Sequence, residues 1–114
     1  MHEMSIAQAV IDTVLREMQH RGITRVSKIA LRIGVWSGVM AEAVQFGYES
    51  LRLDTALQHT SLEIEQVGLQ LYCRQCRQTT EVRAATLACP SCRSDQIQVS
   101  GGDELDIAFF VAEE

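Results

Sequence analysis

The chain contains four cysteines, which form two Cys-x-x-Cys pairs, Cys73 with Cys76 and Cys89 with Cys92. The two-residue spacing lets a tight turn direct both sulfurs of a pair at one metal ion, and two such turns complete the four-thiolate set of a tetrahedral Zn²⁺ site. Twelve residues separate the pairs, a spacing that suits the hairpin of a short zinc ribbon. We predict a structural zinc site, because four bound sulfurs leave no position open for water or substrate.

Three other uses of the cysteines are a disulfide framework, a pair of redox motifs and an iron–sulfur cluster. Disulfides require an oxidising compartment, and the first residues lack the basic start of a signal peptide, so we expect a cytoplasmic protein. A redox dithiol usually opens a helix after a strand, whereas the residues beside these cysteines are typical of hairpins. Structural zinc is therefore the favoured interpretation.

The size and charge of the chain exclude several classes of protein. Its 114 residues, 46% of them hydrophobic, suffice for one modest core with a metal-stabilised appendage, and no apolar run is long enough to span a membrane. Residues 1–69 carry a net charge of −2, residues 70–98 carry +2 and residues 99–114 carry −5. This acidic balance argues against a nucleic-acid partner, and the four arginines of the cysteine region favour one only weakly.

Hydrophobic periodicity predicts two helices. Residues 5–8, Ser-Ile-Ala-Gln, have the form of a capping box, so we expect the first helix to begin at Ser5 and to end before Gly22. A second helix is expected from Val39 to about Thr55. The apolar stripe of the first helix repeats every four residues, through Ile6, Val10, Val14 and Met18.

Alternating apolar residues predict strands over residues 26–33 and 61–67, ribbon strands over 79–83 and 97–99, and a last strand near the C-terminus. The ribbon is too small to cover that last strand, so we expect it to return to the sheet of the first part. The prediction is an α+β fold: two helices on a small three-stranded mixed sheet, residues 1–69 and 100–114, with an inserted four-cysteine zinc ribbon, residues 70–99. The apolar face of the last strand would consist of Leu105, Ile107, Phe109 and Val111.

The first three residues, Met1, His2 and Glu3, offer a second candidate metal site. The amino group of Met1, the amide nitrogen of His2 and its ring Nδ1 can form adjacent five- and six-membered chelate rings, which suits square-planar Ni²⁺ or Cu²⁺. The amide or carboxylate of Glu3, or a partner protein, could supply a fourth ligand. A histidine at position 2 is more often an incidental residue of a frayed end, so its position alone does not favour a metal role. His20 and His59 are expected to be ordinary surface residues.

The opening Met-His-Glu-Met-Ser, the segment from Arg25 to Val39, the paired Cys-x-x-Cys motifs and the closing Gly-Asp-Glu-Leu of residues 102–105 together resemble the HypA/HybF family of hydrogenase nickel-incorporation proteins. The resemblance covers the whole chain. Its most specific part is the combination of an N-terminal Met-His-Glu with a four-cysteine ribbon. Relatives often carry an acidic residue where this chain has Met40, with Glu42 as the nearest carboxylate, so a role for an acid at that point does not transfer.

The resemblance implies a nickel metallochaperone, not an enzyme. It implies that His2 and nearby backbone nitrogens hold transferable Ni²⁺, that Glu3 assists delivery or partner contact, and that the four cysteines hold structural Zn²⁺. The implied partners are the GTPase HypB and the large subunit of [NiFe]-hydrogenase, and some members also serve urease; the chain itself would be a monomer or a weak homodimer.

Two other functions follow from the residues alone. A zinc-ribbon adaptor that binds protein or nucleic acid without a second metal is motivated by the arginines of the ribbon. An enzyme is disfavoured, because the sequence contains no zinc site with an open position, no His-Glu-x-x-His, no glycine-rich phosphate loop and no serine elbow.

Overall fold

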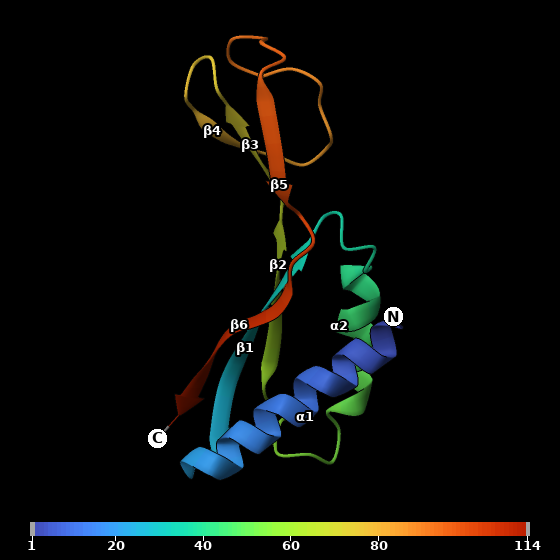
Figure 1. Cartoon of the computed structure of the whole chain (residues 1–114). Coiled ribbons are helices and arrows are strands. Elements are labelled where there is room, and N and C mark those ends of the chain that lie inside the picture. The colour runs from blue at the N-terminus through green and yellow to red at the C-terminus, as the bar shows by residue number, and fades with distance from the viewer. Residues whose placement is uncertain (1, 114) are drawn as a thin grey trace.

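The computed structural model describes residues 2–113, so Met1 and Glu114 lie outside the described residues. Its elements form two three-stranded sheets, β2-β1-β6 and β4-β3-β5 (Figure 1). The radius of gyration is 17.7 Å, compared with about 13 Å for a compact chain of this length, and the molecule is 53 Å long. In chain order the elements are α1 (Glu3–Arg21), β1 (Arg25–Gly34), α2 (Ala41–Leu51), β2 (Ser61–Val67), β3 (Leu69–Cys73), β4 (Thr79–Val82), β5 (Ile97–Gly101) and β6 (Leu105–Glu113).

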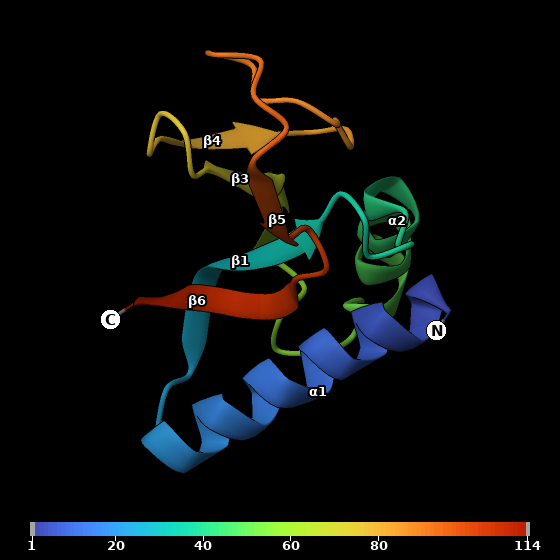
Figure 2. The same cartoon turned by 45° about the horizontal axis from the view of Figure 1, so that its top comes forward.

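The larger sheet is mixed, because its central strand β1 runs parallel to β2 and antiparallel to β6. Both helices cover one face of this sheet (Figure 2). Alternate residues of β1 point into the core, while Lys28 and Arg32 lie on the opposite face, where they pair with Glu63 and Asp106. This arrangement of two helices, a mixed sheet and a separate four-cysteine sheet confirms the predicted fold class.

The hydrophobic core lies between the helices and the larger sheet. All four residues of the predicted stripe on α1 are at most 5% exposed, which confirms the periodicity. Tyr48 of α2 is fully buried, and its hydroxyl donates a 2.7 Å hydrogen bond to the carbonyl of Thr60. The other large buried side chains of this core include Ile11, Ile29, Leu31, Ile33 and Leu57.

Both helices differ from the sequence prediction at their ends. The first begins at Glu3, with His2 as its N-cap, so Ser5 lies inside the helix and forms no capping box. Glu3 in the first turn favours this earlier start, because a carboxylate there complements the helix dipole. The second helix covers only Ala41–Leu51, since the chain turns repeatedly over residues 52–59, with Asp54 at φ 61°. Gly22 ends α1 in the left-handed conformation, φ 65°, as expected.

The last strand returns to pair with β1, as predicted, but the predicted apolar face is wrong. The register shifts at Ala30, so Ile107 lies opposite Leu31 while Phe109 lies opposite Ala30, and Ala108 has no partner on β1. This bulge reverses the direction of the side chains that follow it. Phe110 consequently packs against the core, whereas Phe109 is 52% exposed on the outer face.

The segment after β1 connects the two sheets. The amide of Val35 donates to the carbonyl of Val67 at the end of β2, and the amide of Trp36 donates to the carbonyl of Gly102 between β5 and β6. Gly34 approaches Gly102 so closely that a Cβ at Gly34 would lie 2.2 Å from its carbonyl atoms. The chain passes between the two sheets twice, from β2 to β3 and from β5 to β6. Residues 34–36 are hydrogen-bonded to both connections, and the first of these residues must be glycine.

Candidate metal centre

The first pair of cysteines lies at the end of β3, where the chain turns back toward β4. The amide of Cys73 donates to the carbonyl of Gln78, and the amide of Arg77 donates to the carbonyl of Cys73 at 2.8 Å. Arg77 closes this turn with a positive φ of 61°. These bonds fix Cys73 and Cys76 on the same side of the turn.

The second pair repeats this construction in the long connection between β4 and β5. The amide of Cys89 donates to the carbonyl of Ser94, the amide of Arg93 donates to the carbonyl of Cys89, and Arg93 has a φ of 64°. Pro90 follows the first cysteine, where its fixed φ suits the turn. The turns at residues 73–78 and 89–94 therefore have the same hydrogen-bond pattern, and they bring the two cysteine pairs together at one end of the smaller sheet.

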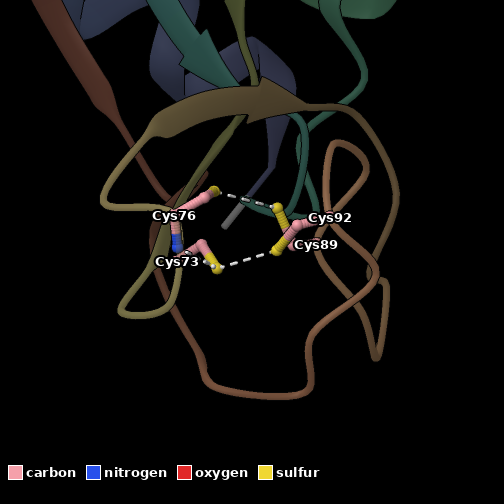
Figure 3. Close-up of side chains that lie close together, drawn as sticks. All are labelled: Cys73, Cys76, Cys89 and Cys92. Atoms are coloured by element: carbon pink, nitrogen blue, oxygen red, sulfur yellow. Dashed lines mark hydrogen bonds between the residues drawn. The ribbon is translucent and has the colours of Figure 1, made fainter.

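The four sulfurs point toward one another from these turns (Figure 3). The Sγ atoms of Cys73 and Cys92 are 3.5 Å apart, those of Cys76 and Cys89 are 3.7 Å apart, and all four lie within 4.8 Å. A tetrahedral site with Zn–S bonds of about 2.3 Å has sulfur–sulfur separations of about 3.8 Å. The separations exceed the roughly 2.05 Å of a disulfide, and all four cysteines are free. The residues thus fit one tetrahedral metal ion.

The first cysteine of each pair is the more readily ionised. Backbone N–H groups of Cys92 and Ser91 lower the pKa of Cys89 to about 6, and the backbone N–H of Cys76 lowers the pKa of Cys73. For Cys76 a hydrogen bond from the Gln78 backbone opposes the shift, yet burial and the neighbouring thiols raise its pKa to about 12. A metal that binds all four sulfurs must displace their remaining protons, most of all those of Cys76 and Cys92, whose pKa values are raised.

The structure places His2 directly before α1, with an exposed side chain and an extended backbone of φ −77° and ψ 139°. Glu3 follows in the helix, and its carboxylate accepts a 3.2 Å hydrogen bond from the amide of Met40. The hydrogen bonds from the amides of Glu3 itself and Met40 lower the pKa of the Glu3 carboxyl. The start of the chain is therefore held beside the start of α2.

Within residues 2–113 the cysteine cluster is the one group of three or more His, Cys, Asp or Glu side chains close enough to share a metal. His2 and Glu3 do not join a further His, Cys or carboxylate, so a metal at this end would need backbone nitrogens, as the chelate geometry requires. Met40 is 65% exposed and Glu42 lies in the first turn of α2. Met1 lies outside the described residues.

Sequence reasoning missed the contact between Glu3 and Met40 and the left-handed arginines after each cysteine pair. The first joins residues 37 positions apart and has no local signal. The second had one: each Cys-x-x-Cys is followed directly by arginine, and this repetition indicates a repeated turn.

Residues 1–111 match the family described as hydrogenase/urease nickel incorporation, metallochaperone, hypA. The chain belongs to the HypA family. It is 36% identical over 107 residues to hydrogenase maturation factor HypA of Rhizobium leguminosarum bv. viciae, and 37% identical over 107 residues to that of Alkalilimnicola ehrlichii, covering 94% of this chain and 95% of each relative.

Two solution structures share the HypA fold at 18% sequence identity. The nickel metallochaperone HypA of Helicobacter pylori aligns with a TM-score of 0.65 over 98% of this chain and 97% of that one. A second structure, titled HypA protein, aligns with a TM-score of 0.69 over 99% of this chain and 97% of that one.

Membership in the HypA family makes this chain a nickel metallochaperone of hydrogenase maturation and places it among non-catalytic proteins. The four-cysteine cluster is its preformed metal site within residues 2–113. None of the helices in that range is long and apolar enough to cross a membrane.

Proposed function

We propose that this HypA protein binds Ni²⁺ at its N-terminus through the amino group of Met1, the amide nitrogen of His2 and the His2 ring, with Glu3 beside them. The observation that supports this site best is the position of His2. Its exposed ring and extended backbone precede the helix, so the amide of His2 is outside the helical hydrogen-bond ladder. A metal displaces the proton of an amide nitrogen more readily when no carbonyl accepts that proton in a hydrogen bond.

The neighbourhood of His2 suits a cargo that must leave again. The Glu3 carboxylate already accepts a hydrogen bond from Met40, so we propose that it anchors the site and that its amide, or a partner protein, completes the nickel shell. Breaking this exposed contact would release the Glu3 carboxylate from the start of α2 during transfer. The proposed recipients are the [NiFe]-hydrogenase large subunit and, in part, urease maturation proteins, with the GTPase HypB as the companion factor.

We propose that the metal on the four cysteines is Zn²⁺ and that its role is structural. The sulfur separations match a tetrahedral ion, and four bound sulfurs leave no position open for a substrate. Such thiolates persist in a reducing compartment, so we propose a cytoplasmic protein. Nickel and zinc would then occupy ligand sets of different chemistry, nitrogen for the cargo and sulfur for the scaffold.

We also propose that residues 70–99 form a ribbon domain inserted into a domain made of residues 1–69 and 100–114. The elongated shape and the presence of two separate sheets support this division. The junction would begin one residue earlier than residue 70, because Leu69 opens β3 and is 2% exposed against Gly102. We expect the HypA protein to be a monomer or a weak homodimer.

The experiment that tests the nickel site is a spectroscopic titration of the zinc-loaded protein with Ni²⁺. We expect one square-planar, diamagnetic complex that is lost in His2→Ala, which removes the ring nitrogen, and in a variant extended by several residues before Met1, which moves the free amino group away from the His2 ring. His20→Ala is the matched control, because this exposed histidine at the end of α1 lies away from the terminus. Loading should weaken as pH falls, because protons compete for the amide nitrogen.

Unchanged nickel binding in the extended variant would exclude the N-terminal site. Loss of binding in His20→Ala to the same degree as in His2→Ala would show that nickel is held by histidines in general and not by the chelate at the chain's start.

A further inference from the structure

The free edge of β6 combines an unpaired strand with an apolar groove. Within residues 2–113, β6 pairs with β1 on one side and with no strand on the other. Figure 2 shows β6 along the open side of the larger sheet, with α1 running beneath it. The outer N–H and C=O groups of such an edge can add a further strand.

The groove lies between this edge and α1. Two hollows of about 270 and 490 Å³ follow the strand, the first beside the N-terminal half of α1 and the second beside its end, and Ile107 lines both. The bulge at Ala108 places Ile107 and Phe110 toward the helix, and both remain only half-buried. The apolar residues that line the groove, here called the β6 groove, include Ile6, Val10, Ile23, Ile107, Phe110 and Ala112.

The charge of β6 indicates the kind of segment that would bind. Residues 103–114 contain five acidic residues and no basic one. Asp106 and Glu113 pair with Arg32 and Arg25 at 3.2 and 3.5 Å, but these pairs are exposed and weak. Even with these two arginines counted, the strand and its flank remain acidic. A basic segment would therefore be attracted, and an acidic one repelled.

A second copy of this chain is a poor occupant for the same reason. In an antiparallel pair of β6 strands that sets Ile107 opposite Phe110 of the other copy, Glu104, directly before the strand, comes beside Glu113 of the other copy. By symmetry this like-charge pair occurs twice. Like charges directly opposite one another destabilise a sheet.

We propose that the β6 groove is a docking site for an extended, basic segment of a partner protein, which adds to β6 as a fourth strand. Alternate apolar side chains of that segment would cover Ile107 and Phe110, and lysine or arginine residues at its ends would lie near Asp106 and Glu113. This surface is formed by α1 and β6 and does not depend on the nickel or cysteine sites, so its failure would leave the proposed function intact.

The test uses the whole zinc-loaded protein and a synthetic peptide of alternating valine and threonine with a pair of lysines at each end. We expect the peptide to shift the amide resonances of β6 and α1, and to bind more weakly as salt concentration rises. The matched control peptide carries glutamates in place of the lysines and should not bind.

Three variants separate groove binding from general attraction. Ala112→Lys places a charge in the groove at an exposed position, and we expect about tenfold weaker binding of the lysine peptide. Gln98→Lys adds the same charge on exposed β5 and should bind as the unchanged protein does. Ala9→Lys, on the α1 side of the groove, repeats the test from the other wall.

Equal binding of both peptides, or binding that neither Ala112→Lys nor Ala9→Lys weakens, would overturn the proposal. So would sedimentation that shows a concentration-dependent dimer abolished by Ala112→Lys, because the occupant of the groove would then be a second copy.

Discussion

At the scale of single residues, spacing alone identified the cysteines, whereas the arginines that close their turns are marked in the sequence only by their repetition after each pair. Arg77 and Arg93 adopt positive φ values of 61° and 64° at equivalent points of the two turns. An L-residue in this conformation costs about 1 kcal/mol, which the folded turn must offset. Side-chain chemistry gave no reason to expect arginine there, since glycine is the usual residue.

Substitutions at Arg93 test this cost. We expect Arg93→Gly to keep the metal as firmly as the unchanged protein, because glycine adopts positive φ freely. Arg93→Val should weaken metal retention by about tenfold or more, because a β-branched residue is strained at this φ. Competition with a chromophoric chelator measures the difference. Equal metal retention in both variants would mean that the turn relaxes and stores no strain.

The fully buried Tyr48 gives the fold a pH limit on the alkaline side. Burial raises the pKa of Tyr48 from 10.0 to about 12. Because the folded-state pKa is raised, the stabilisation is present below pH 10 and is lost as pH rises through 12. We expect one tyrosine to ionise only near pH 12, together with loss of helical circular dichroism.

Tyr48→Phe is the control for that titration. The ultraviolet absorbance step near pH 12 should disappear in this variant, and the free energy of unfolding at neutral pH should fall by about 1 kcal/mol with the lost hydrogen bond to Thr60. Arg52 also donates to the Thr60 carbonyl, so the acceptor is not left unpaired. If the absorbance step near pH 12 persisted in Tyr48→Phe, the step would belong to the other tyrosine, Tyr72, and the account of Tyr48 would be wrong.

At the scale of elements, periodicity predicted which segments form helices and strands, and tertiary contacts decided where they end. Residues 61–67 were predicted with the bounds of β2, because Leu62 and Ile64 alternate with acidic residues and Gly68 ends the run. The last strand was predicted without its bulge, since an extra residue at Ala108 depends on how β6 pairs with β1. Glu3 favours the early start of α1 locally through the helix dipole, and its carboxylate also accepts from the amide of Met40, a contact that only the folded chain creates.

The junction between the sheets depends on Gly34. We expect Gly34→Ala to lower the free energy of unfolding by about 2–3 kcal/mol, because its Cβ would lie 2.2 Å from the Gly102 carbonyl atoms and force backbone apart. Gly22→Ala is the matched control: a Cβ there meets nothing within 4 Å, so only the positive φ is costly, about 1 kcal/mol. Urea unfolding measures both, and equal losses would show that the junction yields without strain.

At the scale of the whole molecule, the chain joins a hydrophobic core to a metal-stabilised sheet that has little core of its own. Leu69, Leu71 and two cysteines supply the fully buried side chains of the smaller sheet. A metal that binds only the folded ribbon contributes its binding free energy to folding. The cysteine spacing and the alternating C-terminal strand predicted two separate sheets. They did not predict that residues 34–36 would connect these sheets, because those hydrogen bonds join residues far apart in the chain.

Removal of zinc should therefore unfold the ribbon and leave the larger sheet and helices intact. We expect a strong chelator to abolish amide protection over residues 69–101 in hydrogen exchange while the circular dichroism of α1 and α2 persists. Cys89→Ser should have the same effect without a chelator, since it removes one of four sulfur ligands. Collapse of both sheets together would show that the ribbon is needed for the core to fold.

The central claim is that nickel and zinc occupy separate places with different ligands, nitrogen at the N-terminus and sulfur in the ribbon. X-ray absorption at the nickel edge of protein loaded with both metals tests this most directly, because nickel–sulfur bonds are longer than nickel–nitrogen bonds and sulfur scatters more strongly. We expect nickel with nitrogen and oxygen neighbours only, and zinc with four sulfurs. Nickel surrounded by sulfur, with zinc displaced from the cysteines, would contradict the account.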